Sequence, residues 1–238
     1  MSSSTTMTER VTLNVADGGT MSAYVARPRR AATAGMLVFQ EAFGVNAHIR
    51  SIADRFAELG LVAIAPELFH RTGPGFEGSY TDFERVRPHT SALTRDGLNA
   101  DIDAAYAWLQ AQGLDAARCA AVGFCMGGRA AYMANGRVRL GAAISFYGGG
   151  IEPDLLGLAT TQSGPILMFW GGLDKHILPE HYRAVADALT TAGATHEQVV
   201  FSQADHGFFC DARASYNPLA ARQAWALLKE FLAAYGVL

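Results

Sequence analysis

The stretch CAAVGFCMGG, residues 119–128, decides the fold of this 238-residue chain. Its first six residues are small or apolar throughout, which is typical of a strand buried on both faces of a sheet. From Cys125 onward the pattern becomes helical, and glycines stand at 123, 127 and 128 around the junction. Glycine has no Cβ atom, so the backbone can turn there from strand into helix without steric clash. We therefore expect Cys125 to lie at the tip of a strained strand–helix turn.

Strand-like and helix-like segments alternate on both sides of this turn. The other strand-like runs are 36–40, 61–67, 142–148, 166–171 and 197–202, and helices are expected near 46–59, 92–111, 125–135, 179–192 and 216–234. A hairpin precedes them, formed by 11–15, a turn at 17–19, and 21–26. This order predicts an α/β fold, a mostly parallel doubly wound sheet with an antiparallel N-terminal hairpin. We expect a flexible N-terminus over 1–10 and a single domain over 11–238.

The composition narrows the classes of function. The sequence is 50% hydrophobic and 17% charged, which is typical of an ordered globular protein. A net charge of −3 gives no basic surface for nucleic acid or an anionic membrane. There is no apolar run near the roughly 20 residues of a membrane helix, and no signal-peptide pattern. We expect a cytoplasmic monomer or small homo-oligomer whose partner is a small molecule.

Cys125 occupies the central position of a G-x-S-x-G nucleophile elbow, with cysteine in place of serine. The N-terminus of the following helix would direct backbone N–H groups at this side chain, which favours a thiolate and stabilises an oxyanion. The alternative is a buried structural cysteine. Cys119, within the strand, and Cys210, which no elbow surrounds, fit that alternative better. The three cysteines show no CxxC metal spacing.

An acid and a histidine follow in the order that hydrolases of this type use. Asp174 comes just after the run 166–171, and His206 comes just after the run 197–202. We interpret them as the orienting acid and the general base. Two alternatives remain for the acid, namely that Asp174 caps the helix near 179 and that Asp205 takes its role. Reading Asp174 with His176 and His181 as a metal site is disfavoured because the ligand set is incomplete, so no metal is expected.

Several segments resemble the dienelactone hydrolase family, the carboxymethylenebutenolidases and their relatives. They are Gln40-Glu41-Ala42-Phe43-Gly44-Val45-Asn46, Gly123-Phe124-Cys125-Met126-Gly127-Gly128, Asp205-His206-Gly207-Phe208, Gly171-Gly172-Leu173-Asp174 and Ala224-Trp225. The resemblance extends over nearly the whole chain. It implies an α/β-hydrolase fold and a hydrolase that acts on a small ester or lactone without a cofactor.

The resemblance also implies roles for residues outside the triad. Glu41 matches a carboxylate that contacts the thiol and helps to generate the thiolate when substrate binds. The backbone N–H groups of Ala42 and Met126 match an oxyanion hole. The residues themselves agree in part, because a carboxylate after the strand 36–40 would lie at the carboxyl edge of the sheet, where burial raises its pKa. The alternative is a surface glutamate in a loop.

The chain departs from the family in its arginines. The dienelactone enzymes hold a substrate carboxylate with arginines, one of them shortly after the catalytic histidine, but here no arginine follows His206 until Arg213. Arg85 and Arg87 are the other candidates, by rough position. Aromatic residues are candidates for the lining instead, although all could equally belong to the core: Phe43, Tyr147, Phe208 and Phe209. We expect a substrate less strictly anionic than dienelactone.

The expected reaction is hydrolysis through a thioester on Cys125. Two alternatives stay open. The same residues could transfer an acyl group or hydrolyse another carbonyl compound. The chain could also be a non-catalytic binding protein with an α/β-hydrolase fold, because a fold does not dictate a function.

Overall fold

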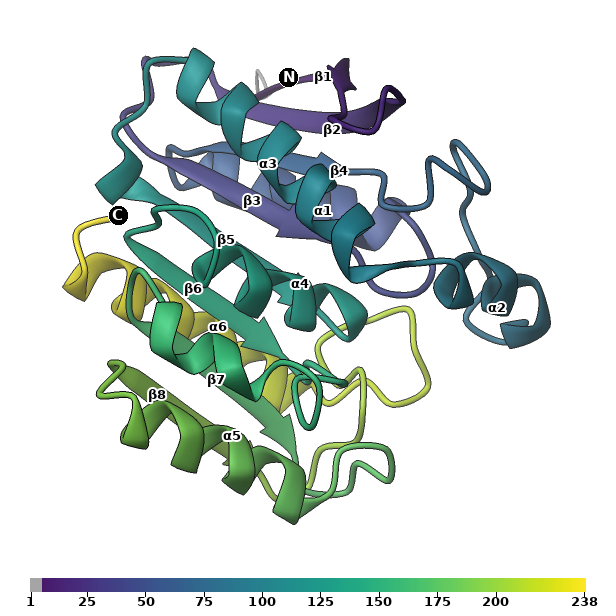
Figure 1. Cartoon of the computed structure of the whole chain (residues 1–238), viewed down its shortest axis with the longest axis vertical. Helices are drawn as coiled ribbons and strands as arrows, with labels where there is room; N and C mark the ends of the chain where they lie inside the picture. Colours follow the sequence, from purple (N-terminus) through teal and green to yellow (C-terminus); the bar gives the residue numbers. More distant parts are fainter. Residues whose placement is uncertain (1–5) are drawn as a thin grey trace.

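The computed structural model describes residues 6–238, which form one eight-stranded sheet in the order β1-β2-β4-β3-β5-β6-β7-β8 (Figure 1). The strands are β1 (Thr6–Asn14), β2 (Thr20–Pro28), β3 (Gly35–Phe39), β4 (Val62–Pro66), β5 (Cys119–Phe124), β6 (Ala142–Phe146), β7 (Ile166–Gly171) and β8 (His196–Phe201). Strands β4, β3, β5, β6, β7 and β8 run parallel, while β2 pairs antiparallel with β1 and β4. The predicted fold class is confirmed.

Helices cover both faces of this sheet (Figure 1). They are α1 (Ala47–Glu58), α2 (Phe83–Ser91), α3 (Arg95–Ala111), α4 (Met126–Asn135), α5 (Pro179–Thr191) and α6 (Pro218–Ala234), with 3-10 turns η1 (Ala116–Arg118) and η2 (Leu156–Thr161). Helices α1 and α6 lie behind the sheet in this view, and α3, α4 and α5 lie in front. Because both faces are covered, strands β3 to β7 are buried at nearly every residue, which explains their continuous apolar runs.

A row of phenylalanines crosses the centre of the sheet. Phe124, Phe146 and Phe169 occupy neighbouring register positions on β5, β6 and β7. The ring centroids of Phe124 and Phe146 lie 4.8 Å apart, and those of Phe146 and Phe169 lie 4.6 Å apart. Phe209, from the loop before α6, packs on this row. The row thus fixes both the carboxyl ends of the strands and the loop that follows β8.

The structure differs from the sequence-based expectation at two places. Strand β1 begins at Thr6, and residues 6–10 pair with β2, so they belong to the sheet and not to a flexible N-terminus. Their side chains are mostly exposed, which hides the strand from a search for apolar patterns. Residues 1–5 lie outside the described part of the chain. Helix α2 was not expected, because it is short, polar and contains Pro88, and its first turn is capped by Asp82.

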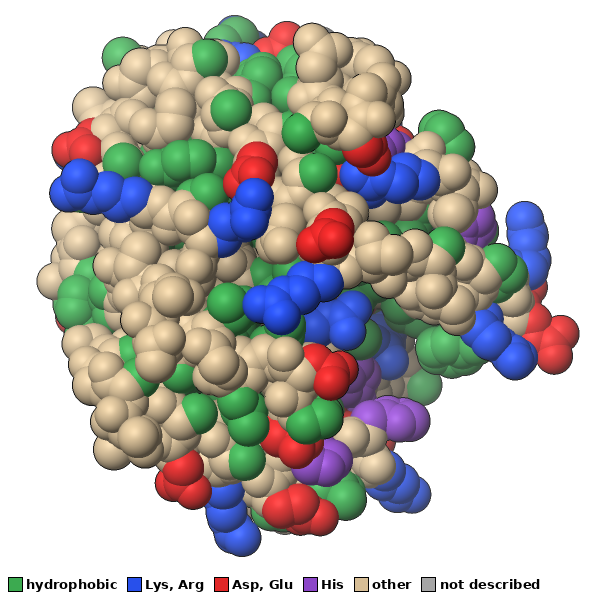
Figure 2. Space-filling view, in the orientation of Figure 1, with side chains coloured by type: hydrophobic (Ala, Val, Ile, Leu, Met, Phe, Trp, Pro, Cys, Tyr) green, Lys and Arg blue, Asp and Glu red, His purple; other side chains and the backbone are tan. Residues whose placement is uncertain are grey.

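On the face shown in Figure 2, acidic and basic side chains are interspersed, and no large patch carries charge of one sign. This distribution agrees with the net charge of −3. Among residues 6–238, no helix has the length and apolar character needed to span a membrane.

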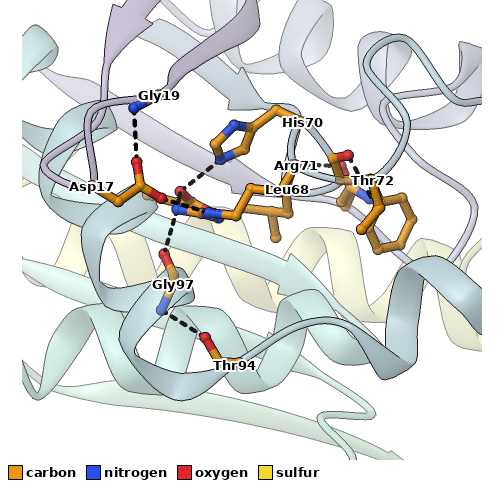
Figure 3. Close-up of polar contacts among 11 residues, drawn as sticks. Asp17, Gly19, Leu68, His70, Arg71, Thr72, Thr94 and Gly97 are labelled. Carbon is orange, nitrogen blue, oxygen red and sulfur yellow. Dashed lines mark hydrogen bonds and ion pairs between the residues drawn. The ribbon is translucent and has the colours of Figure 1, made fainter.

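A buried ionic network holds the segment that follows β4 (Figure 3). Asp101 on α3 is fully buried, and its carboxylate accepts hydrogen bonds from Nη1 and Nη2 of Arg71 at 2.9 and 2.8 Å. Nε2 of His70 lies 3.0 Å from the same carboxylate. Arg71 also donates from Nε to Asp17 in the hairpin turn, at 2.7 Å. The network ties β1–β2, the segment after β4 and α3 together.

Replacing Asp101 by alanine should destabilise the protein strongly, because it leaves the guanidinium of Arg71 and the ring of His70 without their buried partner. We expect a loss of about 3 to 5 kcal/mol in the free energy of unfolding, measured by urea denaturation. Asp103→Ala is the matched control on the same helix, because Asp103 and its partner Arg137 are both about 40% exposed, and an exposed ion pair contributes at most about 1 kcal/mol. Equal losses in the two variants would contradict this role for Asp101.

Candidate active site

Cys125 lies between β5 and α4 in a conformation that L-amino acids rarely adopt, with φ 56° and ψ −120°. Its backbone N–H donates to the carbonyl of Phe146 at 3.0 Å, which anchors the turn to β6. A non-glycine residue in this region costs on the order of 1–3 kcal/mol, so the surrounding structure must impose it. The turn presents the Cys125 side chain at the carboxyl edge of the sheet.

The glycines beside Cys125 are required by close backbone contacts. A Cβ atom on Gly123 would lie 1.8 Å from the carbonyl oxygen of Gly127, and one on Gly127 would lie 2.3 Å from that of Phe39. Both distances are far below van der Waals contact. The first turn of α4 therefore packs directly on the end of β3, which brings Cys125 close to the segment that begins at Gln40.

His206 and Asp174 meet at the same edge. Nδ1 of His206 lies 2.7 Å from Oδ2 of Asp174. Oδ1 of Asp174 accepts the backbone N–H groups of His176 and Ile177 at 2.8 and 3.0 Å, which fixes the carboxylate. Asp205 instead accepts the backbone N–H of His206 at 2.6 Å. Of the two candidate acids, Asp174 is the one that contacts the imidazole ring.

The charges of this pair stabilise each other. Burial by itself lowers the pKa of His206, but hydrogen bonds to Asp174 and Cys125 outweigh it and raise this pKa well above its usual range. Burial raises the pKa of Asp174, but the bonds from His206, His176 and Ile177 lower it more, so the net shift is downward. These contacts favour the imidazolium form of His206 beside the ionised carboxylate of Asp174.

Glu41 follows β3 and is completely buried. Its Oε1 accepts a hydrogen bond from Nη1 of Arg213 at 3.0 Å, whereas Oε2 has no hydrogen-bond partner within the described residues. Burial raises the pKa of Glu41, and the charge of Arg213 opposes this only in part. Tyr147 lies close enough to Glu41 and to Cys125 for both charges to raise the pKa of its hydroxyl, after burial as the main cause.

Ala42 and Met126, whose N–H groups are the candidate oxyanion donors, both neighbour Cys125. Met126 is the first residue of α4, so its N–H has no acceptor within the helix. Ala42 lies beside Cys125 in the lining of the adjoining cavity. Within residues 6–238, neither N–H is donated to a turn or loop acceptor.

A cavity of about 550 Å³ opens over Cys125 and His206. Its lining includes two of the expected substrate-binding residues, Phe43 and Arg213. Tyr147 and Phe208 are instead fully buried, and Tyr147 packs against His206 with ring centroids 5.0 Å apart. Arg85 and Arg87 are exposed on α2 and are not among the residues that line the cavity.

Sequence reasoning missed the residues that α2 and its preceding loop bring to the cavity. Tyr80 and Phe83 line it, and each packs against Phe43 with ring centroids 4.6 and 5.5 Å apart. Phe83 is 57% exposed, so it stands at the cavity entrance. The aromatic residues between 76 and 83 were the available signal in the sequence. Because helix α2 was not predicted, nothing indicated that these residues would line the cavity.

The structure does not assemble the disfavoured metal set of Asp174, His176 and His181. Both oxygens of Asp174 are occupied by His206 and backbone N–H groups. Nδ1 of His181 accepts the N–H of Leu178 instead. This local cap at the start of α5 explains the spacing of the histidine without a metal.

The comparisons with known proteins agree with this geometry. The model of the "Dienelactone hydrolase family" matches residues 21–236. A Salmonella typhimurium protein named "Putative carboxymethylenebutenolidase" is 36% identical over 233 residues, covering 92% of this chain and 84% of its own. The "Carboxymethylenebutenolidase" of Pseudomonas putida is 28% identical, covering 95% and 97%. A Klebsiella pneumoniae crystal structure titled as a "Putative Dienelactone Hydrolase" superposes with a TM-score of 0.87 at 33% identity, covering 96% and 98%.

The family match spans the sheet from β2 to the end of α6, and it includes the strand–helix turn, the buried acid and the histidine described above. The chain therefore belongs to the dienelactone hydrolase family and is an α/β-hydrolase-fold enzyme that hydrolyses carboxylic esters or lactones.

Proposed function

We propose that this enzyme hydrolyses a small lactone or ester through a thioester on Cys125, with His206 as acid and base and Asp174 as its orienting partner. One observation carries the proposal. Cys125, at the strained turn, lines the same cavity as His206, and Nδ1 of His206 lies 2.7 Å from the buried carboxylate of Asp174. Such a chain of contacts is the arrangement that activates a nucleophile in covalent catalysis.

In the first half of the proposed reaction, the Cys125 thiolate attacks the acyl carbon and the carbonyl oxygen becomes an oxyanion. The N–H groups of Ala42 and Met126 stabilise this charge. The intermediate collapses when the bond to the leaving oxygen breaks, and His206 gives its proton to that oxygen. The thioester remains on Cys125, and a lactone substrate stays attached as a hydroxy acyl group.

In the second half, His206 takes a proton from water as the water attacks the thioester carbon. The tetrahedral intermediate then expels the Cys125 thiolate and releases the carboxylic acid. His206 keeps the proton taken from water, and the sulfur recovers the proton that Glu41 accepted when the thiolate was generated. Asp174 stabilises the imidazolium in both halves, because its own pKa is held below the usual range.

Glu41 is proposed to take part in generating the thiolate. Burial raises its pKa and so favours its protonated form, and Oε2 has no hydrogen-bond partner within the described residues. Arg213 holds the other oxygen and keeps the carboxylate in place. A substrate that engages Arg213 would weaken this contact, so substrate binding and thiol activation would be linked.

The lining of the cavity suggests a substrate with limited negative charge. Among the described lining residues, Arg213 is the one arginine or lysine, and it is already paired with Glu41. Phe43, Tyr80 and Phe83 also line the cavity, and the guanidinium carbon of Arg213 lies 5.5 Å from the centroid of the Phe43 ring. A single engaged guanidinium offers weaker carboxylate recognition than a free bidentate one. The proposed substrate is therefore a small lactone or ester less strictly anionic than dienelactone.

Cys125→Ala should abolish hydrolysis of a p-nitrophenyl ester while the protein stays folded, because no other thiol lies at the turn. Rapid-quench mass spectrometry of the wild type should detect an acyl group on the peptide that contains Cys125. Cys119→Ala is the control, since Cys119 is buried in β5. Substantial turnover by purified Cys125→Ala would exclude the covalent mechanism.

Asp174 and His206 should act as one unit. Asp174→Asn removes the charge that raises the pKa of His206, so NMR titration should show this pKa falling, and kcat should fall by about 10⁴-fold as in related triads. Combining it with His206→Ala should cost little more than His206→Ala alone. A larger loss from Asp205→Asn than from Asp174→Asn would transfer the acid role to Asp205.

Specificity should depend on Arg213. For the wild type, kcat/KM for cis-dienelactone should exceed that for an uncharged lactone of similar size by less than about a hundredfold, which corresponds to roughly 2.7 kcal/mol. Arg213→Gln should reduce the anionic substrate's kcat/KM more than the uncharged one's. Arg85→Gln, on the exposed face of α2, should change neither value. A wild-type preference above a hundredfold would show that other basic groups reach the substrate.

A further inference from the structure

Three potential metal ligands converge in a place that the proposed reaction uses only in part. Glu41 follows β3, His48 lies in the first turn of α1, and Cys210 lies in the loop before α6. In the part of the chain that the structure describes, these three offer ligand atoms that all lie within 4.8 Å of one another. Segments far apart in the sequence therefore supply one carboxylate, one imidazole and one thiol to a common point.

Two of these groups carry buried atoms without a hydrogen-bond partner. Oε2 of Glu41 and Nε2 of His48 are both inaccessible to solvent and unpartnered within the described residues. Their side chains are 1% and 7% exposed. An unpaired buried polar atom costs about 1–3 kcal/mol, so two of them on residues that also face one thiol call for a partner that the described residues do not supply.

We propose that Glu41, His48 and Cys210 form a site for a zinc-type divalent cation, with Oε2, Nε2 and Sγ as the three protein ligands. Carboxylate oxygen, imidazole nitrogen and thiolate sulfur are the ligand types that Zn²⁺ prefers. Tetrahedral coordination at zinc distances separates ligand atoms by about 3.3–3.8 Å, so the cluster has to contract by about 1 Å. A solvent molecule would take the fourth position.

The neighbouring groups suit this assignment. Nδ1 of His48 lies 3.7 Å from Oδ1 of Asp211, in the position of the carboxylate that commonly orients a zinc-bound histidine. Burial lowers the pKa of His48 to about 4, which leaves the ring neutral as a ligand. The thiol of Cys210 is 3.2 Å from the Tyr80 hydroxyl, which can donate to a thiolate. Arg213 occupies only Oε1 of Glu41.

The charges around the cluster are of both signs. The thiolate of Cys210 and the carboxylate of Glu41 would supply two negative charges for a divalent cation, while the Arg213 guanidinium on Oε1 of Glu41 adds one positive charge beside the site. His48 lines a second cavity of about 510 Å³, between α1 and α6, whose lining shares Ala212 with the cavity over Cys125. Of the three proposed ligands, His48 is the one that lines this second cavity.

Zinc binding would also affect turnover, and this consequence rests on the proposed role of Glu41. A cation on Oε2 would hold the carboxylate and prevent it from accepting the thiol proton. Binding itself does not depend on that role, so the two are measured separately.

The test uses the full chain, freed of metal with a chelator and then titrated with ZnCl₂ by calorimetry. Wild type should bind one equivalent, and Cys210→Ser and His48→Gln should each weaken binding by at least about tenfold. Cys119→Ser, the matched buried thiol, should bind as wild type does, and so should Cys125→Ala. Circular dichroism checks that each variant is folded.

Cobalt substitution identifies the sulfur ligand. Addition of CoCl₂ should give a thiolate-to-cobalt charge-transfer band that is lost in Cys210→Ser and kept in Cys125→Ala. Absence of binding, or a site lost in Cys125→Ala but kept in Cys210→Ser, would overturn the proposal. If zinc binds through Cys210 and ester hydrolysis stays unchanged, the site stands and the proposed role of Glu41 fails.

Discussion

The close approach of α4 to the ends of β3 and β5 is the contact on which the active-site edge depends. Gly127 lies against the carbonyl of Phe39, and Gly123 lies against the carbonyl of Gly127. These contacts leave no space for a methyl group, and they force Cys125 into its left-handed conformation. The same contacts set the helix N-terminus beside Glu41 and Ala42. A rigid backbone junction thus determines where sulfur, amide donors and carboxylate meet.

Buried charges surround this junction, and each is compensated in a different way. Asp174 is held by an imidazole and two backbone N–H groups, an arrangement that keeps it ionised. Glu41 has one guanidinium on one oxygen and nothing on the other within the described residues. Asp101, remote from the cavity, is saturated by Arg71 and His70. Asp174 and Asp101 are thus fully paired, whereas Glu41 keeps one oxygen without a hydrogen-bond partner, and our two proposals for Glu41 start from that oxygen.

The fold could be predicted because its signals are local. Strands buried on both faces give continuous apolar runs, and the glycines around Cys125 mark the turn. Elements stabilised by backbone pairing or by their neighbours were missed or shortened, since their sequences are polar. Residues 6–10 join the sheet through pairing with β2. Helix α2 follows the loop that carries Tyr80. It is short and contains Pro88, so the hydrophobic periodicity of the sequence did not predict it.

By itself the sequence determined the fold class, the strand–helix turn and the identities of Cys125, Asp174 and His206 as candidates, because motif order and strand ends are readable along one chain. Only the tertiary structure decided which groups touch. In the structure, Asp174 and not Asp205 contacts the ring of His206. Glu41 pairs with Arg213, 172 positions further along the chain, and the side chains of Arg85 and Arg87 are exposed to solvent. The tertiary structure also assembled Glu41, His48 and Cys210. Such contacts arise where loops from distant strands pack at one edge of the sheet, and no local pattern encodes that packing.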